Sequence, residues 1–291
     1  MYYIILILSI PLAIFSDDRL RLKRADILEN VVIDGQAVQY LTGNVVFEKG
    51  AMIINCDKAI NIEKTGQGSM IGNVKVVDDN RSLTCDSLHY DSPNDILNGF
   101  GNARVWDNDY DLLADTLVYY SKLDSGIARG NTELTQKSQI ITSHSIYYTK
   151  HTGEDAVSYT AEGDVTILAD ERKATCGLAI YNREDETTWL KLNPNVIEKD
   201  QTMAGSEIIL RYKDEVMEHL YIPEQAHVTT LTKGLQEIKI SLNDTTTTRS
   251  EVQFVDDLTG SSLQGFFDEG QMDSLQVEGM ATSLYHIFED S

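Results

Sequence analysis

The stretch Ile71-Gly-Asn-Val-Lys-Val76 decides the fold, because it contains a Gly-Asn pair followed by apolar residues at alternate positions. The pair recurs every 29 residues, at Gly43-Asn44, Gly72-Asn73, Gly101-Asn102 and Gly130-Asn131. A looser continuation is found at Gly163-Asp164, Pro194-Asn195 and Gly279-Met280. A fixed period of this length is typical of a repeat protein, in which each unit buries its apolar face against its neighbours.

Each repeat contains two stretches of alternating apolar residues. In the copy that begins at Gly72, the first pair of inward residues is Val74 and Val76, and the second pair is Leu83 and Cys85. Alternation of this kind predicts strands with one buried face. A polar turn separates the two stretches, as expected between antiparallel strands. Each repeat is therefore expected to supply about two strands, or about fourteen to sixteen in the chain.

The alternation changes parity later in each repeat. After Cys85 the next inward residues are Leu88 and Tyr90, three residues further on instead of two. Because a step of three inverts the pleat, the strand is expected to bend there and to continue on a second wall. The predicted fold is all-β, an elongated structure of two walls with an apolar trough between them.

The inward positions define the candidate site. The residues expected to line an apolar groove are Val45, Phe47, Ile54, Val74, Val76, Leu83, Leu88, Val105, Leu112, Leu117, Leu134, Ile141 and Ile146. The residues expected at its rim are the tyrosines Tyr90, Tyr119, Tyr148, Tyr181 and Tyr212. Two roles are open for these rings, which either close the edge of the core or offer hydroxyls to a ligand.

The composition limits the partners and the secondary structure. The chain has 46 acidic and 24 basic residues, a formal net charge of −22. This balance argues against nucleic acid or an anionic membrane surface as the main partner, because both attract basic proteins. Only four prolines occur, and no apolar pattern of period 3.6 persists through the repeats, so helices are expected to be few.

The N-terminal residues differ from the rest of the chain. Residues 1–16 carry no charge and contain an apolar run too short to span a bilayer, which is typical of a secretory signal peptide. An uncleaved N-terminal anchor is the alternative. Residues 17–30 are assigned to a leader segment and residues 31–291 to one repeat-built domain. Within that domain the regular spacing is interrupted over about 231–258.

No pattern indicates catalysis. The six histidines lack metal-binding spacing, and no phosphate-binding loop or nucleophile elbow is present. Asp57, Asp86 and Asp115 recur once per repeat, which favours an outward polar position over a catalytic one. The three cysteines occupy one position of the repeat that also accepts Ala114 or Ser143, as expected for a small core site. We therefore expect neither catalytic residues nor a metal or cofactor.

The motifs resemble those of a known family. Ile71-Gly-Asn-Val-Lys-Val76 with Leu83-Thr-Cys-Asp-Ser-Leu-His-Tyr90, repeated as Leu97 to Val105 with Leu113 to Tyr119, resembles the OstA-like (LptA-type) lipopolysaccharide-transport family. The resemblance covers about Leu22 to Tyr285. It implies a twisted, open β-jellyroll in the periplasm of a Gram-negative cell. Such a protein carries lipopolysaccharide along its apolar interior towards the outer membrane.

Three functions remain open from the sequence. The first is a non-enzymatic periplasmic carrier of lipopolysaccharide or a related glycolipid. This carrier would join other jellyroll subunits of a transport bridge, or further copies of itself, by head-to-tail strand addition. The second is a structural β-solenoid scaffold of the cell envelope, whose interior is filled. The third, with the least support, is a secreted glycan-acting enzyme, which requires two acidic residues that converge in a cleft.

Overall fold

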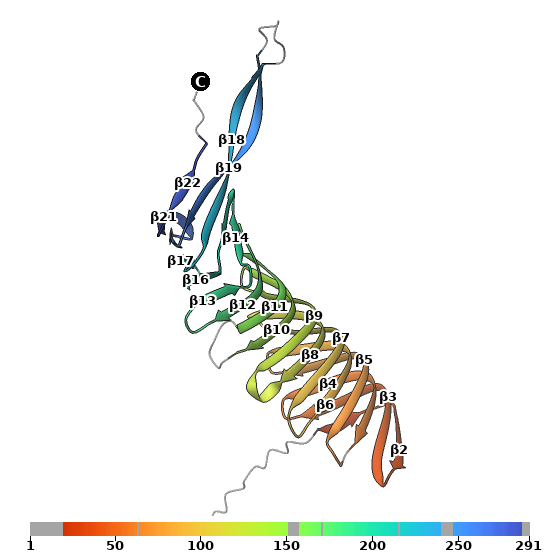
Figure 1. Cartoon of the computed structure of the whole chain (residues 1–291). Coiled ribbons are helices and arrows are strands. Elements are labelled where there is room, and N and C mark those ends of the chain that lie inside the picture. The colour runs from red at the N-terminus through yellow and green to blue at the C-terminus, as the bar shows by residue number, and fades with distance from the viewer. Residues whose placement is uncertain are drawn as a thin grey trace, which may run out of the picture.

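The protein is an elongated, twisted β structure (Figure 1). The computed structural model describes residues 20–62, 64–150, 157–169, 171–214, 216–239 and 247–286. These residues form 22 strands of one sheet, in which the paired strands are antiparallel, and one short 3-10 turn, η1 (Ser121–Leu123). The predicted all-β, open fold is confirmed. The predicted signal peptide, residues 1–16, lies outside the described residues.

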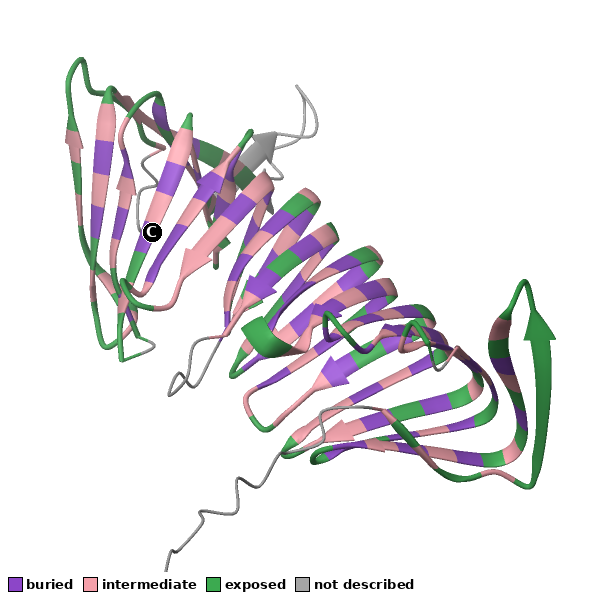
Figure 2. Ribbon diagram, turned by 90° about the horizontal axis from the view of Figure 1, so that it is seen from below, coloured by how far each residue is buried: buried purple, intermediate pink, exposed green. Residues whose placement is uncertain are grey.

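Ten long strands form the regular part of the sheet, and each pairs with the next in sequence order. They are β3 (Gln36–Lys49), β4 (Met52–Ile62), β5 (Gln67–Asp78), β6 (Arg81–Asp91), β7 (Ile96–Trp106), β8 (Tyr110–Tyr120), β9 (Ser125–Gln136), β10 (Gln139–Thr149), β11 (Ser158–Ala169) and β12 (Arg172–Asn182). Each bends near its middle, so that the nested strands form two walls that meet at a corner (Figure 2). We keep the word trough for the space between these walls, which is occupied by the buried side chains of the core. The bends form the corner of the trough, and the turns between strands form the two rims of its mouth.

We call the two sides wall A and wall B. In β5, residues 67–71 belong to wall A and residues 74–78 belong to wall B. The register shifts between Ile71 and Val74, and in β6 it shifts between Thr84 and Ser87. The predicted change of parity in mid-strand is therefore confirmed. The sequence pattern predicts a Gly-Asn pair in front of a strand. In the structure the pair lies inside the strand, at this bend.

The corner explains why Gly and Asn recur. Gly72 and Asn73 both have positive φ, 79° and 47°, a region that glycine and asparagine tolerate best. Asn73 Nδ2 donates a hydrogen bond to Asp57 Oδ2 at 2.8 Å. A Cβ on Gly72 would lie 2.5 Å from the same carboxylate oxygen, so a side chain there is excluded by both backbone and space. Asp57 is exposed, as predicted for this position.

The same corner hydrogen bond joins each of four Asn residues to an Asp, which lies on the preceding strand in three cases and between β1 and β2 in the fourth. The four pairs are Asn44 with Asp26, Asn73 with Asp57, Asn102 with Asp86 and Asn131 with Asp115. In the next repeat His144 takes the place of the Asp and Asp164 takes the place of the Asn. Their side chains also meet, with His144 Nε2 3.4 Å from Asp164 Oδ2. The carboxylates of the repeats thus have a structural role at the outer side of the corner.

After β12 the sheet divides into two branches, and each strand belongs to one wall only. Wall A continues through β13 (Thr187–Lys191), β16 (Glu207–Lys213), β17 (Val216–Ile222), β20 (Ser262–Asp268) and β21 (Gln271–Glu278). Wall B continues through β14 (Asn195–Glu198), β15 (Gln201–Ala204), β18 (Ala226–Lys239), β19 (Thr247–Gly260) and β22 (Thr282–Leu284). The expected fourteen to sixteen strands were too few because these branches use two short strands where a single long strand serves in the regular part.

The described residues of the stretch 231–258, predicted to be irregular, belong to the two strands of a long hairpin. Its strands, β18 and β19, pair continuously from Ala226 with Gly260 to Lys239 with Thr247. The hairpin projects from the body at the C-terminal end (Figure 1). The polar run from Asn243 to Thr248 includes residues 243–246, which lie outside the described residues. The interruption of the period therefore corresponds to a change of architecture, not to a loss of strands.

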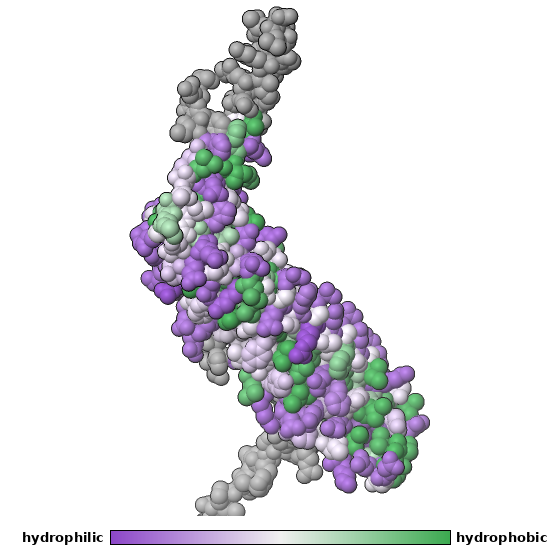
Figure 3. Space-filling view, in the orientation of Figure 1, coloured by the Kyte–Doolittle hydropathy of each residue, from purple (hydrophilic) through white to green (hydrophobic). Residues whose placement is uncertain are grey.

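The N-terminal end of the sheet is formed by two strands that both pair with β3. β1 (Arg21–Arg24) pairs with the wall B half of β3, and β2 (Ile27–Ile33) pairs with its wall A half. Strands therefore already occur within residues 17–30, the segment assigned to a leader. β2 leaves several apolar side chains exposed, with Val32 at 74 % and Ile27 at 56 %. Figure 3 shows hydrophobic residues gathered at this end of the molecule.

Candidate functional site: an apolar trough with a closed mouth

The trough is lined by the side chains predicted to face inward. All thirteen predicted groove residues are buried, each no more than 5 % exposed. They belong to one core that also includes residues of the branches, such as Met203, Leu220 and Leu263. Outward neighbours such as Lys75 are exposed. The predicted inward orientation is confirmed, and the predicted role in binding stays a prediction.

Several inward residues were missed by the sequence reasoning. Leu41, Met70 and Leu97 are each no more than 1 % exposed and lie on wall A, two or four residues before the Gly of their repeat. The signal that marks them is the same alternation, which runs upstream of each Gly as well as downstream. The Gly-Asn pair interrupts this alternation in mid-strand, so counting inward residues forward from each Gly finds only the half of the strand that follows it.

The predicted rim tyrosines lie at the ends of the strands, near the mouth. Tyr90 and Tyr148 are fully buried and Tyr119 is nearly so, whereas Tyr181 and Tyr212 are partly buried. Burial raises the pKa of Tyr212 to about 12, so its hydroxyl stays neutral at physiological pH. The rings close the edge of the core beneath a layer of charged side chains. The second open role, contact with a ligand, is not tested by this arrangement.

The first group of these charged side chains joins Lys49 and Asp95 across the mouth. Lys49 is the last residue of β3 on wall B, and Asp95 lies in the wall A turn before β7. The Lys49 ammonium forms an ion pair with the Asp95 carboxylate and donates to the Ser92 carbonyl at 2.8 Å. Both side chains are buried, 5 % and 7 % exposed. Tyr90 donates to the same carboxylate at 2.8 Å, and Lys122 lies 2.9 Å from it.

A second group crosses the mouth further along, three strand positions on from Lys49 on wall B and two strand positions on from Asp95 on wall A. Arg81, at the start of β6 on wall B, donates to Asp124 Oδ2 at 2.7 Å in the wall A turn after η1. The same guanidinium donates to the Tyr119 hydroxyl and lies 5.5 Å from the centre of that ring. A single arginine thus connects a carboxylate and a rim tyrosine of the opposite wall.

A third group reverses the direction of the charges. Lys150 follows β10 on wall A, and its ammonium lies 2.7 Å from Asp107 Oδ2 and 2.6 Å from Asp109 Oδ2. Both aspartates belong to the wall B turn between β7 and β8. The Lys150 side chain is 9 % exposed and that of Asp107 is 1 % exposed. We call these three groups the clasps, named by their central pairs Lys49–Asp95, Arg81–Asp124 and Lys150–Asp107.

The clasp carboxylates titrate differently. Burial opposes ionisation of Asp95, but hydrogen bonds from Lys122, Lys49 and Tyr90 outweigh it and hold the pKa of this carboxyl below its usual value. Burial also raises the pKa of Asp107, but its hydrogen bonds, that from Lys150 foremost, and the charge of Lys150 together lower it more, so the pKa of this carboxyl is below its usual value as well. For Asp124 burial prevails over the attraction of Arg81, and its pKa is raised. The surroundings of the first and third clasps therefore lower the pKa of the central carboxylate, and those of the second raise it.

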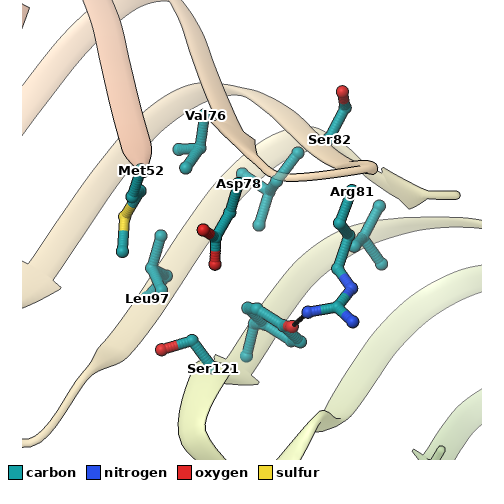
Figure 4. A pocket seen from close by; sticks show the side chains of 10 residues that line it. Met52, Val76, Asp78, Arg81, Ser82, Leu97 and Ser121 are labelled. Carbon is teal, nitrogen blue, oxygen red and sulfur yellow. Dashed lines mark hydrogen bonds between the residues drawn. The ribbon is translucent and has the colours of Figure 1, made fainter. Parts of the chain in front are cut away.

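Beneath the clasps the trough is filled by the protein's own side chains. A cavity of about 20 Å³ lies between Met52, Val76, Leu97 and Arg81, the cation of the second clasp (Figure 4). This is room for about one water molecule. An occupant as large as an acyl chain can enter this region of the trough only when the two walls separate.

The family of the chain is shown by a comparison of its sequence with protein-family models. A family model described as OstA-like protein matches residues 61–206, half of the chain. The chain belongs to the OstA-like family. The resemblance expected from the sequence is confirmed.

The OstA-like chain is less similar to proteins of known structure. The crystal structure of LptH, the LptA homologous periplasmic component of the conserved lipopolysaccharide transport device from Pseudomonas aeruginosa, is similar at 15 % sequence identity. The match covers 50 % of this chain and 93 % of that chain, with a TM-score of 0.34. No curated protein matches the chain. Among the described residues, no helix is long and apolar enough to cross a membrane.

The segment matched by the family model runs from the end of β4 to the residue before β16. It contains the second and third clasps, and of the first clasp it contains Asp95 but not Lys49. Near its end the mouth changes, because Arg172 donates to the Gly270 carbonyl and pairs with Glu198 at 3.2 Å. Beyond Arg172 an open hollow of about 480 Å³ lies between the turn at Lys199 and the edge strand β21. The OstA-like trough is thus closed along its regular part and open in its branches.

The three cysteines of this OstA-like chain are free and buried. Burial raises the pKa of Cys56, Cys85 and Cys176 to about 11. Their thiols stay protonated at neutral pH, and thiols in this state react slowly. The interpretation of this repeat position as a small core site is confirmed.

Proposed function

We propose that the protein is a non-enzymatic periplasmic carrier of lipopolysaccharide or a related glycolipid, with the acyl chains held in the apolar trough. The observation that carries this proposal is the continuous apolar interior, which runs from Leu41 on β3 to Leu263 on β20. A surface of this kind suits a ligand that is long, apolar and uniform along its length. Membership of the OstA-like family agrees with this role.

The energetics of acyl binding do not require directional contacts. Each CH₂ group removed from water contributes about 0.8 kcal/mol, so several chains of ordinary length bind strongly once the walls admit them. Displaced core side chains must find new packing partners, and this reduces the net gain. Binding by shape and apolar contact alone tolerates variation in chain length. Movement along the trough needs a source of energy outside this chain.

The proposed partners, besides the lipid, are other jellyroll subunits joined head to tail. The N-terminal end offers the outer edges of β1 and β2, and the C-terminal end offers those of β21 and β22. Unpaired strand edges are ready templates for strand addition. The exposed apolar residues of β2 add area that a second subunit can cover. Residues 1–16 are proposed as the export signal. Residues 31–291, together with the N-terminal strands β1 and β2 that pair with β3, are proposed as one domain.

A second candidate function is a structural scaffold of the envelope, and the filled interior of the regular part favours it. A scaffold needs only a stable core, and a cavity of about 20 Å³ is consistent with one. The carrier and the scaffold differ in what lies between the walls in the cell. They are distinguished by probing that space directly.

Photo-crosslinking tests the carrier proposal. A photoreactive residue replaces Val76, which faces the trough, or Lys75, which lies next to it on β5 and faces solvent. In cells that make labelled lipopolysaccharide, we expect labelled adducts from position 76 and none from position 75. Leu117 on wall A serves as a second inward position. Equal labelling at inward and outward positions, or no labelling at either, would leave the scaffold as the better account.

A further inference from the structure

The three clasps place one buried cation, Lys49, and two partly buried cations, Arg81 and Lys150, at the boundary between the apolar interior and water. Each cation is held by a carboxylate from the opposite rim, so the walls cannot separate unless the clasps break. Lys49 and Arg81 belong to wall B, and Lys150 belongs to wall A. Positive groups therefore stand on both rims of the mouth, directly above the core residues.

The position of the clasps determines which part of a bound ligand lies next to them. If acyl chains fill the interior, the polar portion of the same molecule lies at the mouth, because this is where the apolar lining ends. Separation of the rims removes Asp95 from Lys49 and Asp107 from Lys150. An ammonium that stays partly desolvated without a counterion costs free energy. An anionic group of the ligand can replace the lost carboxylate.

The geometry points to the clasps as a lateral gate and as the headgroup site of the trough. In this proposal, which rests on the carrier function proposed above, an amphiphile with an anionic headgroup enters sideways through the mouth. Its anionic groups replace Asp95, Asp124 and Asp107 as the partners of Lys49, Arg81 and Lys150. The ligand class is an acylated amphiphile that carries phosphate or carboxylate.

The spacing along the rim favours a ligand with more than one anionic group. Lys49 lies on β3 and Arg81 lies on β6, three strand positions further along wall B. Adjacent strands are about 4.8 Å apart, so the two backbone positions are separated by about 14 Å along the trough. Both side chains are long and can swing, so two anionic groups somewhat closer together can contact both cations.

The two halves of one clasp give a sharp test. Lys49→Met and Asp95→Asn both break the Lys49–Asp95 ion pair, and Asp95→Asn also takes the charged partner from Lys122. A purely structural role therefore predicts that the affinity changes in the same direction in both variants. The gate proposal predicts opposite changes in affinity for the probe, diphosphoryl lipid A. Lys49→Met loses a charged contact with phosphate and lowers the affinity about tenfold. Asp95→Asn removes the competing carboxylate and raises it about threefold or more.

A second probe separates the headgroup from the acyl chains. For lipid A from which both phosphates have been removed, Lys49→Met is expected to bind at least as well as the natural protein, because the gate is weaker and no phosphate contact is lost. A triple variant, Lys49→Met with Arg81→Met and Lys150→Met, is expected to lose its preference for the phosphorylated probe altogether. Thermal unfolding of each variant confirms that it is folded at the temperature of the binding measurement.

The matched control is an ion pair that does not cross the mouth. Arg104 and Asp111 form a bidentate pair on the outer face of wall B, with Nε to Oδ1 at 2.9 Å. Arg104→Met and Asp111→Asn remove the same charges from neighbouring strands and are expected to leave the affinity unchanged.

The exchange variant Lys49→Asp with Asp95→Lys keeps one cation in the clasp and is expected to restore part of the preference for phosphate.

The outcomes distinguish this proposal from the carrier function. If both halves of the clasp change the affinity in the same direction, or if the triple variant keeps its preference for phosphate, the gate proposal is overturned and the carrier function stands. If neither the natural protein nor any variant binds either probe, the carrier function fails and the gate fails with it. Opposite changes in the two half-clasp variants, with no effect in the Arg104 control, support the gate.

Discussion

The regular part of the sheet, β3 to β12, and its branches, β13 to β22, use the same kind of sequence in different ways. Between β3 and β12 each strand serves both walls, and it must bend once at the corner. In the branches each strand serves one wall, and a hollow of about 480 Å³ opens at the mouth. The 29-residue period is strict from Gly43 to Gly130, where every second strand has the Gly-Asn bend. The bend of β11, at Gly163, follows Gly130 by 33 residues, and in the branches, where no strand bends between the walls, the period is lost. The period therefore records the corner more than it records the strands.

The largest difference between the two regions is expected in the cost of removing core volume. Leu134→Ala empties a site that is fully buried in the regular part, whereas Leu275→Ala changes a partly buried side chain beside the hollow. We expect Leu134→Ala to lower the free energy of unfolding by about 3 kcal/mol, and Leu275→Ala by about 1 kcal/mol or less. Urea unfolding of both variants measures this. Equal losses would mean that the branches are packed as tightly as the regular part.

A smaller difference is expected at glycines with positive φ. In the regular part Gly101 has φ 73°, and a Cβ there would lie 2.3 Å from Asp86 Oδ2. In the branches Gly270 has φ 77°, but the nearest atom to a Cβ is a Val216 methyl at 3.4 Å.

Gly101→Ala therefore combines backbone strain with a clash and the loss of the corner bond, whereas Gly270→Ala has the strain alone. We expect losses of about 2 to 3 kcal/mol and about 1 kcal/mol, respectively. The change in the thermal unfolding midpoint checks the order of the two variants. A larger loss for Gly270→Ala would show that the corner relaxes more easily than its contacts imply.

The smallest effect is expected in the pH dependence of the clasps. The folded pKa of Asp95 is lowered, so its contribution to stability is present above the unfolded pKa of about 3.9 and is lost as the pH falls through the folded value. The folded pKa of Asp124 is raised, so this group makes the opposite contribution, favouring the folded state as the pH falls. Asp95→Asn should therefore flatten the loss of stability in acid, and Asp124→Asn should steepen it. Urea midpoints between pH 7 and pH 3 measure both slopes. The same slope in both variants contradicts the assignment of opposite shifts.

The features of this fold that could be predicted are those encoded within one repeat. Inward residues such as Val76 and Leu83 follow from alternation, and the mid-strand bend follows from the three-residue step before Leu88. The wall A residues before each Gly, such as Met70, were encoded in the same way but were missed. The division after β12 was not predicted, because the sequence there lacks a strict period from which to count strands.

The clasps could not be predicted, for a different reason. Lys49 and Asp95 are 46 residues apart, and Arg81 and Asp124 are 43 residues apart. Neither separation is a multiple of the 29-residue period, because each clasp joins a turn of one wall to a turn of the other wall in a later repeat. The pairing depends on how far the twisted walls are displaced along the axis. The chain has 46 acidic and 24 basic residues, and no sequence pattern marks which of them pair across the mouth.

The corner bond between Asp57 and Asn73 has a consequence for how such a protein can change its length. Each bond joins one repeat to the next, so a unit of 29 residues brings one new Asp, one new Gly-Asn bend and two new strands. Tandem duplication of the DNA that encodes residues 72–100 would insert a unit whose two ends already match its neighbours. The trough would become longer by two strand spacings, about 10 Å. Its reach is thus set by the number of units in the gene, and it can grow in equal steps without a new fold.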